Sequence, residues 1–187
     1  MLINLSKAFF LFVKNPVFIP NSKNSKEKVK HVFLYFILGF TVSIILVLFS
    51  FTIISDFNSN FANVPQRDEP ILDNGIIIAI LLVGFLVPIV EEFLFRLPLR
   101  LYYNTPKLKF AYYFSSVVFA LFHIFNYKLD GFLNFTSFFI LLPIFFGGLL
   151  LGYVRVVYGF KYSVMLHMLH NFTIVLILSI FNVYFEY

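Results

Sequence analysis

Long apolar runs limit what this chain can fold into. The run from Val32 to Ile54 is apolar almost throughout, and further runs follow at Gly75 to Val90 and Phe135 to Val157. A helix needs about 20 apolar residues to cross a hydrocarbon layer of roughly 30 Å. The chain is 60% hydrophobic and 12% charged, whereas an average globular domain has about 25% charged residues. The sequence therefore predicts an integral membrane protein.

The apolar runs predict an all-α fold, a polytopic transmembrane helix bundle of about five spans with an N-terminal interfacial helix. We expect residues 1–31 to form an interfacial and basic N-terminal segment, and residues 32–187 to form the bundle. The expected spans are residues 32–54, 75–103, 110–125, 135–157 and 162–184, with polar connections at 55–74 and 126–134.

Positive charge falls mainly on one side of the predicted topology. The N-terminal segment, the connection at 96–109 and the turn at 155–161 share that side, and only Arg67 and Lys128 lie on the other. Because cytoplasmic loops carry the excess of Lys and Arg, we expect the N-terminus in the cytoplasm and the C-terminus outside. The net charge of +5 is thereby explained by topology, so the expected partner is the lipid bilayer and not nucleic acid.

Cysteine is absent from the sequence. Disulfides, thiolate metal ligands and a cysteine nucleophile are therefore excluded.

Glu91, Glu92 and Arg96 stand inside the second predicted span, where charges cost several kcal/mol and are functional by default. Glu92 and Arg96 are four apart and are expected to form an intrahelical ion pair. Glu91 points about 100° away from Glu92 and from this pair. We therefore expect Glu91 to take part in chemistry, and Glu92 and Arg96 to support the site. Pro88 removes a backbone donor one turn earlier, so neighbouring protein or water should satisfy the freed carbonyl.

The third span contributes Phe119 and His123, which are four apart and share one face. Glu91 lies about 18 Å from the inner end of its helix, and His123 about 20 Å from the inner end of its own. We therefore expect Glu91 and His123 to meet at the same depth.

The fifth span contributes His167 and Asn171, which again share one face. His167 is only roughly 8 Å from the start of its helix, so that helix must begin deeper or tilt. His170 lies on a neighbouring face, where we expect it to pack between helices or to support the site.

A carboxylate and two imidazoles around one water suit two chemistries. Glu91 could act as general base on water that attacks an amide, with a histidine protonating the leaving amine or stabilising the oxyanion and Asn171 donating a further hydrogen bond. Alternatively, Glu91, His123 and His167 could bind a catalytic zinc ion. Taken singly, each of these residues could instead hold two helices together through an interhelical hydrogen bond, which contributes about 0.6 to 2 kcal/mol.

These residues resemble the motifs of the CPBP intramembrane endopeptidases, which include the type II CAAX-prenyl proteases and the bacteriocin-processing or bacteriocin-immunity (Abi) proteins. The motif EExxxR matches Glu91, Glu92 and Arg96, FxxxH matches Phe119 and His123, and HxxxN matches His167 and Asn171. The motifs follow in the family's order, and the resemblance covers about residues 81–173, including the helix that carries Gly147, Gly148 and Gly152.

The resemblance implies proteolysis of a membrane-associated peptide or protein substrate in the plasma membrane of a prokaryote. Glu91 would activate water, His123 and His167 would assist or bind metal, and Asn171 would stabilise the oxyanion. Both zinc-dependent and metal-independent descriptions of the family exist, so the choice between the chemistries stays open. The alternative function within the same family is a non-catalytic bacteriocin self-immunity or membrane scaffolding protein.

Overall fold

The computed structural model describes residues 1–57, 75–126 and 135–185 of the chain. These ranges hold helices and no strand, which confirms the predicted all-α fold. In chain order the elements are α1 (Leu2–Lys14), α2 (Ser25–Phe57), a broken helix made of α3 (Ile76–Ala79), η3 (Ile80–Leu86), α4 (Val87–Glu91), η4 (Glu92–Arg96) and η5 (Leu97–Tyr102), then α5 (Leu108–Phe122), η6 (His123–Asn126), α6 (Phe135–Val157) and α7 (Phe160–Phe185).

Five helical segments are long and apolar enough to cross a membrane, as predicted. They are Ser25–Ile54, Ile76–Tyr102, Leu108–Asn126, Thr136–Val157 and Phe160–Ile180. Large apolar side chains such as Ile45, Leu48 and Phe110 are exposed on their outer faces, where lipid would cover them. The protein is therefore a multi-pass membrane protein with an additional N-terminal helix.

The first span begins earlier than predicted. We expected a basic segment before residue 32, but α2 already starts at Ser25. Asn24 Oδ1 accepts a hydrogen bond from the Glu27 backbone N–H at 3.0 Å, as an N-cap does, and lysines are good helix formers. Lys26, Lys28 and Lys30 thus lie in the first turns of α2. Most of the two predicted polar connections, at 58–74 and 127–134, lies outside the described residues.

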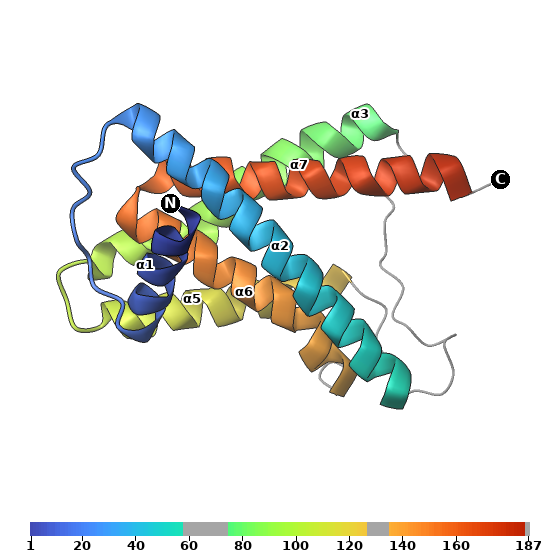
Figure 1. The fold of residues 1–187 in the computed structure, drawn as a ribbon, viewed down its shortest axis with the longest axis horizontal. Helices are drawn as coiled ribbons and strands as arrows, with labels where there is room; N and C mark the ends of the chain where they lie inside the picture. The colour runs from blue at the N-terminus through green and yellow to red at the C-terminus, as the bar shows by residue number, and fades with distance from the viewer. Residues whose placement is uncertain (58–74, 127–134, 186–187) are drawn as a thin grey trace.

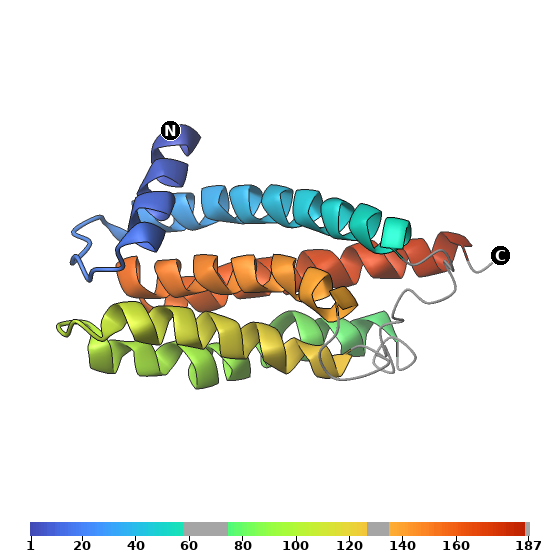
Figure 2. The ribbon, with the colours of Figure 1, turned by 90° about the horizontal axis from the view of Figure 1, so that it is seen from below.

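The long helices form three layers (Figure 1 and Figure 2). One outer layer is α2, the middle layer holds α6 and α7, and the other outer layer holds α5 and the broken helix. The most extensive contacts of α6 are with α2 and α5, and the broken helix packs mainly on α7. This arrangement brings α4, η6 and α7 together inside the bundle.

α1 crosses one end of the bundle (Figure 2). Its buried residues Leu5, Phe9 and Phe12 lie on one helical face. The Tyr35 hydroxyl donates a hydrogen bond to the Leu5 carbonyl at 3.2 Å. The other face exposes apolar side chains together with lysines, which is the pattern of an interfacial helix.

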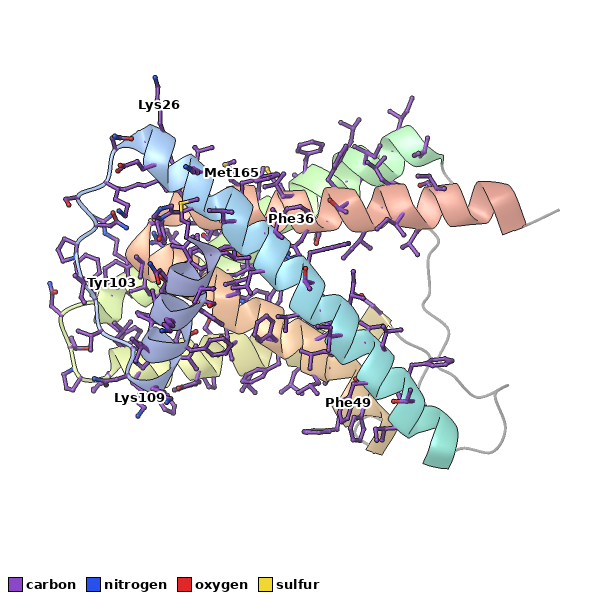
Figure 3. The ribbon with its side chains drawn as sticks, in the orientation of Figure 1. Lys26, Phe36, Phe49, Tyr103, Lys109 and Met165 are labelled. Carbon is purple, nitrogen blue, oxygen red and sulfur yellow. The ribbon has the colours of Figure 1, made fainter. Side chains whose placement is uncertain are left out.

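The same end of the bundle carries basic and aromatic side chains, and we call it the basic end. Lys26, Tyr103 and Lys109 lie there, far from Phe49 near the opposite end of α2 (Figure 3). The Tyr158 hydroxyl and His31 Nδ1 are 3.0 Å apart, and burial raises the pKa of Tyr158. The hydroxyl therefore stays protonated and can donate.

Candidate active site

The broken helix changes its hydrogen bonding on both sides of the two glutamates. The turns of η3 and η4 are π-helical, which is rare and frequent at functional sites. In a π turn the Val83 carbonyl would accept from residue 88, but Pro88 has no backbone N–H. Asn171 Nδ2 donates to this carbonyl at 3.1 Å instead. The prediction that neighbouring protein satisfies the carbonyl freed by Pro88 is confirmed.

Glu91 lies between two histidines, each from a different helix. Its Oε1 is 3.9 Å from His123 Nε2, and its Oε2 is 3.3 Å from His167 Nε2. The exposed fractions of the side chains are 12% for Glu91, 20% for His123 and 4% for His167. Glu91 and His123 therefore meet as predicted, and α7 brings His167 to the same place.

Both imidazoles are held by hydrogen bonds through their other ring nitrogen. His123 Nδ1–H donates to the Phe119 carbonyl at 2.9 Å, and His167 Nδ1–H donates to Glu92 Oε1 at 3.2 Å. The proton is assigned to Nδ1 in each ring because a carbonyl and a carboxylate only accept. The Nε2 atoms are therefore the ones that face Glu91.

A carboxylate and two Nε2 lone pairs repel one another at these distances unless a positive charge lies among them. A proton on an imidazole or on Glu91 provides that charge, and so would a metal ion. Within the described residues Glu91 Oε2 has no hydrogen-bond partner, although His167 Nε2 lies 3.3 Å away. The cluster is suited to take up and release a proton, as general acid–base catalysis requires.

Arg96 does not form the predicted ion pair with Glu92. Both side chains are fully buried, yet no ion pair joins them in the described part of the chain. Arg96 instead donates to Ser115 Oγ at 2.9 Å and to the Gly148 carbonyl at 3.3 Å. An intrahelical pair stabilises by only a few tenths of a kcal/mol, whereas a buried guanidinium has five donors to satisfy. Acceptors on α5 and α6 supply more of them than Glu92 could.

The Phe119 ring connects the supporting residues to the histidines. Its centre is 4.5 Å from the Arg96 guanidinium carbon, 4.6 Å from the His123 ring and 5.6 Å from the His167 ring. The ring thus fixes both imidazoles from one side and covers the buried cation. This placement fits the supporting position predicted for Phe119.

A cavity of about 520 Å³ extends from the cluster into the apolar part of the bundle. Its volume lies in the usual range for ligand sites. Apolar residues of α2, η3, α6 and α7 form most of its wall, and its polar lining residues are Ser43, Glu91, His123, Asn126, His167, His170 and Asn171.

Three of these lining residues were not predicted as part of the site. Ser43 and Asn126 were not singled out, and His170 was assigned to a neighbouring face. Their polarity within or beside apolar spans was the available signal. Which wall they would face depended on how α2 crosses α6 and α7, which no pattern within one helix specifies.

A comparison with protein families agrees with this geometry. The family model described as type II CAAX prenyl endopeptidase Rce1-like matches residues 73–173, more than half of the 187 residues. The chain belongs to this family. The matched residues include Glu91, His123, His167 and Asn171. Comparisons with curated proteins and with solved structures gave no match.

Membership of the Rce1-like family confirms the predicted resemblance and gives the chain a CAAX-type intramembrane protease fold. The matched segment contains the broken helix, α5, α6 and the first half of α7. These are the elements that carry the cluster. The catalytic roles of the individual residues stay predictions.

The donor atoms of the cluster have the right chemistry for zinc, but their spacing does not fit it as placed. Adjacent ligands of a tetrahedral zinc ion lie roughly 3.3 Å apart. His167 and Glu91 match this separation, whereas His123 is 3.9 Å from Glu91. Accordingly, no group of three or more His, Cys, Asp or Glu side chains among the described residues is arranged to hold a metal ion.

Proposed function

We propose that the protein is an intramembrane endopeptidase that cleaves a membrane-associated peptide or protein, as in CAAX processing or the processing of a peptide precursor. The observation that supports this most is the position of Glu91 between two oriented imidazoles at the polar end of an apolar cavity. A buried carboxylate of this kind is expensive to maintain in a membrane. Helix packing alone does not require it.

Glu91 is the general base in this proposal. Its carboxylate takes a proton from a water molecule as the oxygen attacks the carbonyl carbon of the scissile amide. The C–N bond then breaks, and the proton passes to the leaving amine. His167 is well placed to hold the developing oxyanion or to carry this proton, because its Nε2 lies 3.3 Å from Glu91.

Glu92 is a positioning residue in this proposal. Its carboxylate accepts from His167 Nδ1 at 3.2 Å and so stabilises an imidazolium while keeping the ring turned toward Glu91. His123 has a neutral carbonyl in the equivalent place. His167 is therefore the imidazole better suited to carry positive charge, and His123 the one better suited to orient water or substrate.

Asn171 is proposed to donate a hydrogen bond to the oxyanion. One of its amide N–H groups is already used by the Val83 carbonyl, which fixes the side chain at the cavity wall. The second N–H is the one available to substrate.

Zinc dependence is a second proposal, supported by the chemistry of the three acceptor groups that face one another, and it requires His123 Nε2 to move closer to Glu91 than its present 3.9 Å. Glu91, His123 and His167 would hold the ion, with the Phe119 carbonyl and Glu92 orienting the two imidazoles. Zinc would polarise the substrate carbonyl and acidify a bound water. Metal analysis of active protein, followed by chelation and return of zinc, tests this; full activity in metal-free protein would contradict it.

We also propose a prokaryotic plasma-membrane location with the N-terminus in the cytoplasm. The lysines at the basic end support this orientation, because positive residues are retained on the cytoplasmic side.

The test compares purified variants on a library of membrane-anchored peptides, with products followed by mass spectrometry. We expect Glu91→Gln to lose about 10²–10⁴-fold in activity and His123→Ala and His167→Ala to lose a substantial part. Glu27→Gln is the matched control, since Glu27 is an exposed carboxylate at the start of α2.

Equal product formation by wild type and Glu91→Gln would contradict the proposal. Peptide binding without cleavage by the wild type would favour the immunity or scaffolding function instead.

A further inference from the structure

His170 lies in the cavity wall but takes no part in the proposed reaction. It belongs to α7, and its ring packs against Phe36 of α2 with ring centres 5.2 Å apart. Phe36 itself lies where α2 passes over α7 (Figure 3). The imidazole is thus placed between two helices at the edge of the cavity, beside the apolar lining.

The orientation of the His170 ring is fixed. Nδ1–H donates to the Leu166 carbonyl at 3.1 Å, and the rings of Phe36 and Phe40 lie beside the imidazole with centres 5.2 Å and 6.2 Å away. Gly39 makes room for the ring, because a Cβ at that position would lie 3.1 Å from His170 Nε2. Nε2 therefore has a defined position.

His170 Nε2 has no hydrogen-bond partner within the described residues, where the only bond of this side chain runs through Nδ1. His170 also forms no ion pair there, and an unpaired charge in an apolar wall is costly. The imidazole is thus neutral, and Nε2, which lies beside Gly39 and is not one of the fully buried unsatisfied atoms among the described residues, is a preoriented acceptor on a residue that lines the cavity. Such an acceptor suits a ligand that brings an N–H group.

A peptide in this cavity brings that group. The wall around His170 is largely apolar, and backbone N–H groups of an extended peptide would lose their hydrogen bonds to water there unless the protein supplies an acceptor. We propose that His170 is a substrate-binding residue whose Nε2 accepts a hydrogen bond from one backbone N–H of the peptide. This inference rests on the proposed function.

The helix geometry limits which N–H group this is. His170 is three residues beyond His167 on α7, about 4.5 Å further along the helix axis. An extended peptide advances about 3.3–3.4 Å per residue. For a peptide that runs along α7, the N–H group that reaches His170 therefore belongs to a residue one or two positions from the scissile bond.

The experiment uses depsipeptide substrates in which one backbone N–H at a time is replaced by an ester oxygen. With wild type, replacement at one position near the scissile bond should raise KM about 3- to 12-fold. His170→Phe should raise KM for the all-amide peptide by a similar factor and leave kcat within about twofold. In this variant the ester at that position should no longer raise KM, and we call the rise in KM caused by an ester its ester penalty. His170→Gln keeps an acceptor and should restore part of the affinity.

His31→Phe is the matched control, because His31 bonds Tyr158 and does not line the cavity. His170→Leu replaces His170→Phe if the larger variant does not fold. Unchanged ester penalties in the His170 variants would overturn the inference, since a purely structural role does not select one N–H group of the substrate.

Binding of the same peptides to the full-length Glu91→Gln protein is measured in parallel. If wild type cleaves but the ester penalties do not depend on His170, the proposed function stands and this inference fails. If nothing is cleaved but binding shows the coupling, the inference stands and the proteolytic function fails. Absence of both cleavage and binding overturns both.

Discussion

Two parts of the bundle gather polar side chains from several helices: the basic end, and the part around Glu91, His123, His167 and the cavity, which we call the cavity half. The two parts differ in how far these side chains are hydrogen-bonded. At the basic end, the Tyr35 and Tyr153 hydroxyls are 2.8 Å apart. Tyr112 donates to the Leu149 carbonyl at 2.7 Å. In the cavity half, by contrast, Glu91 Oε2 has no hydrogen-bond partner among the described residues, although two imidazoles face it.

This difference in hydrogen bonding distinguishes groups that hold helices together from groups that are available to a ligand. A satisfied buried network strengthens its own hydrogen bonds and rigidifies the fold. An under-satisfied one costs free energy and persists where something else completes it. Residue type does not distinguish the two halves, since both use side chains that titrate. The halves are distinguished by the neighbours that surround these side chains.

The border between the two halves is Arg96, and replacing it should have the largest effect on stability. Arg96→Met removes the donors to Ser115 Oγ and the Gly148 carbonyl, whereas the hydrogen bond between Glu92 and His167 stays in place. We expect a loss of about 2–6 kcal/mol of folding stability, because two buried acceptors lose their donor at about 1–3 kcal/mol each, with activity falling as well. Thermal unfolding in detergent, followed by circular dichroism, measures this.

Arg100→Met is the control for this substitution, because Arg100 is exposed one turn further along. An Arg96→Met protein that unfolds at the wild-type temperature would show that Arg96 does not support the cavity half.

Most of the fold could be predicted because each span is specified by local hydrophobicity. The length of a run such as Phe135–Val157 is enough to define α6. The motif spacings likewise predicted that Glu91 and His123 lie at the same depth, whereas the depth counted for His167 did not match theirs. Information within single helices therefore gave the architecture and the meeting of Glu91 with His123.

Partner choice between helices could not be predicted in the same way. The expected Glu92–Arg96 pair was wrong because acceptors on α5 and α6 compete for the guanidinium. The π turns around Pro88 and the position of His170 beside Phe36 likewise depend on tertiary packing. Spacing along one helix carries no information about these neighbours.

Two glycines of α6 lie in different surroundings, since Gly152 packs against a neighbouring helix and Gly147 lines the cavity. A Cβ on Gly152 would lie 2.9 Å from the buried Tyr112 ring, whereas a Cβ on Gly147 would meet nothing within 4 Å. We expect Gly152→Ala to lose about 1–3 kcal/mol of stability and Gly147→Ala to be neutral or to gain up to about 1 kcal/mol. Thermal unfolding of the two variants checks this, and equal effects would argue against the packing contrast.

A smaller loss than that of Arg96→Met is expected for Asn171, whose side chain bonds the broken helix and also lines the cavity. Asn171→Leu removes the donor to the Val83 carbonyl and should cost about 1–2 kcal/mol. In a Pro88→Ala background, residue 88 regains its backbone N–H and can bond that carbonyl within the helix. The same Asn171→Leu substitution should then cost about 1 kcal/mol less.

A double-mutant cycle on unfolding free energies measures this coupling. Equal costs in both backgrounds would mean that the amide does not replace the donor missing at Pro88. A clear coupling, with activity lost in both Asn171→Leu proteins, would separate two uses of one side chain. One amide N–H would hold the broken helix in shape, and the other would act on the substrate, so that activity is lost even where the stability cost has been removed.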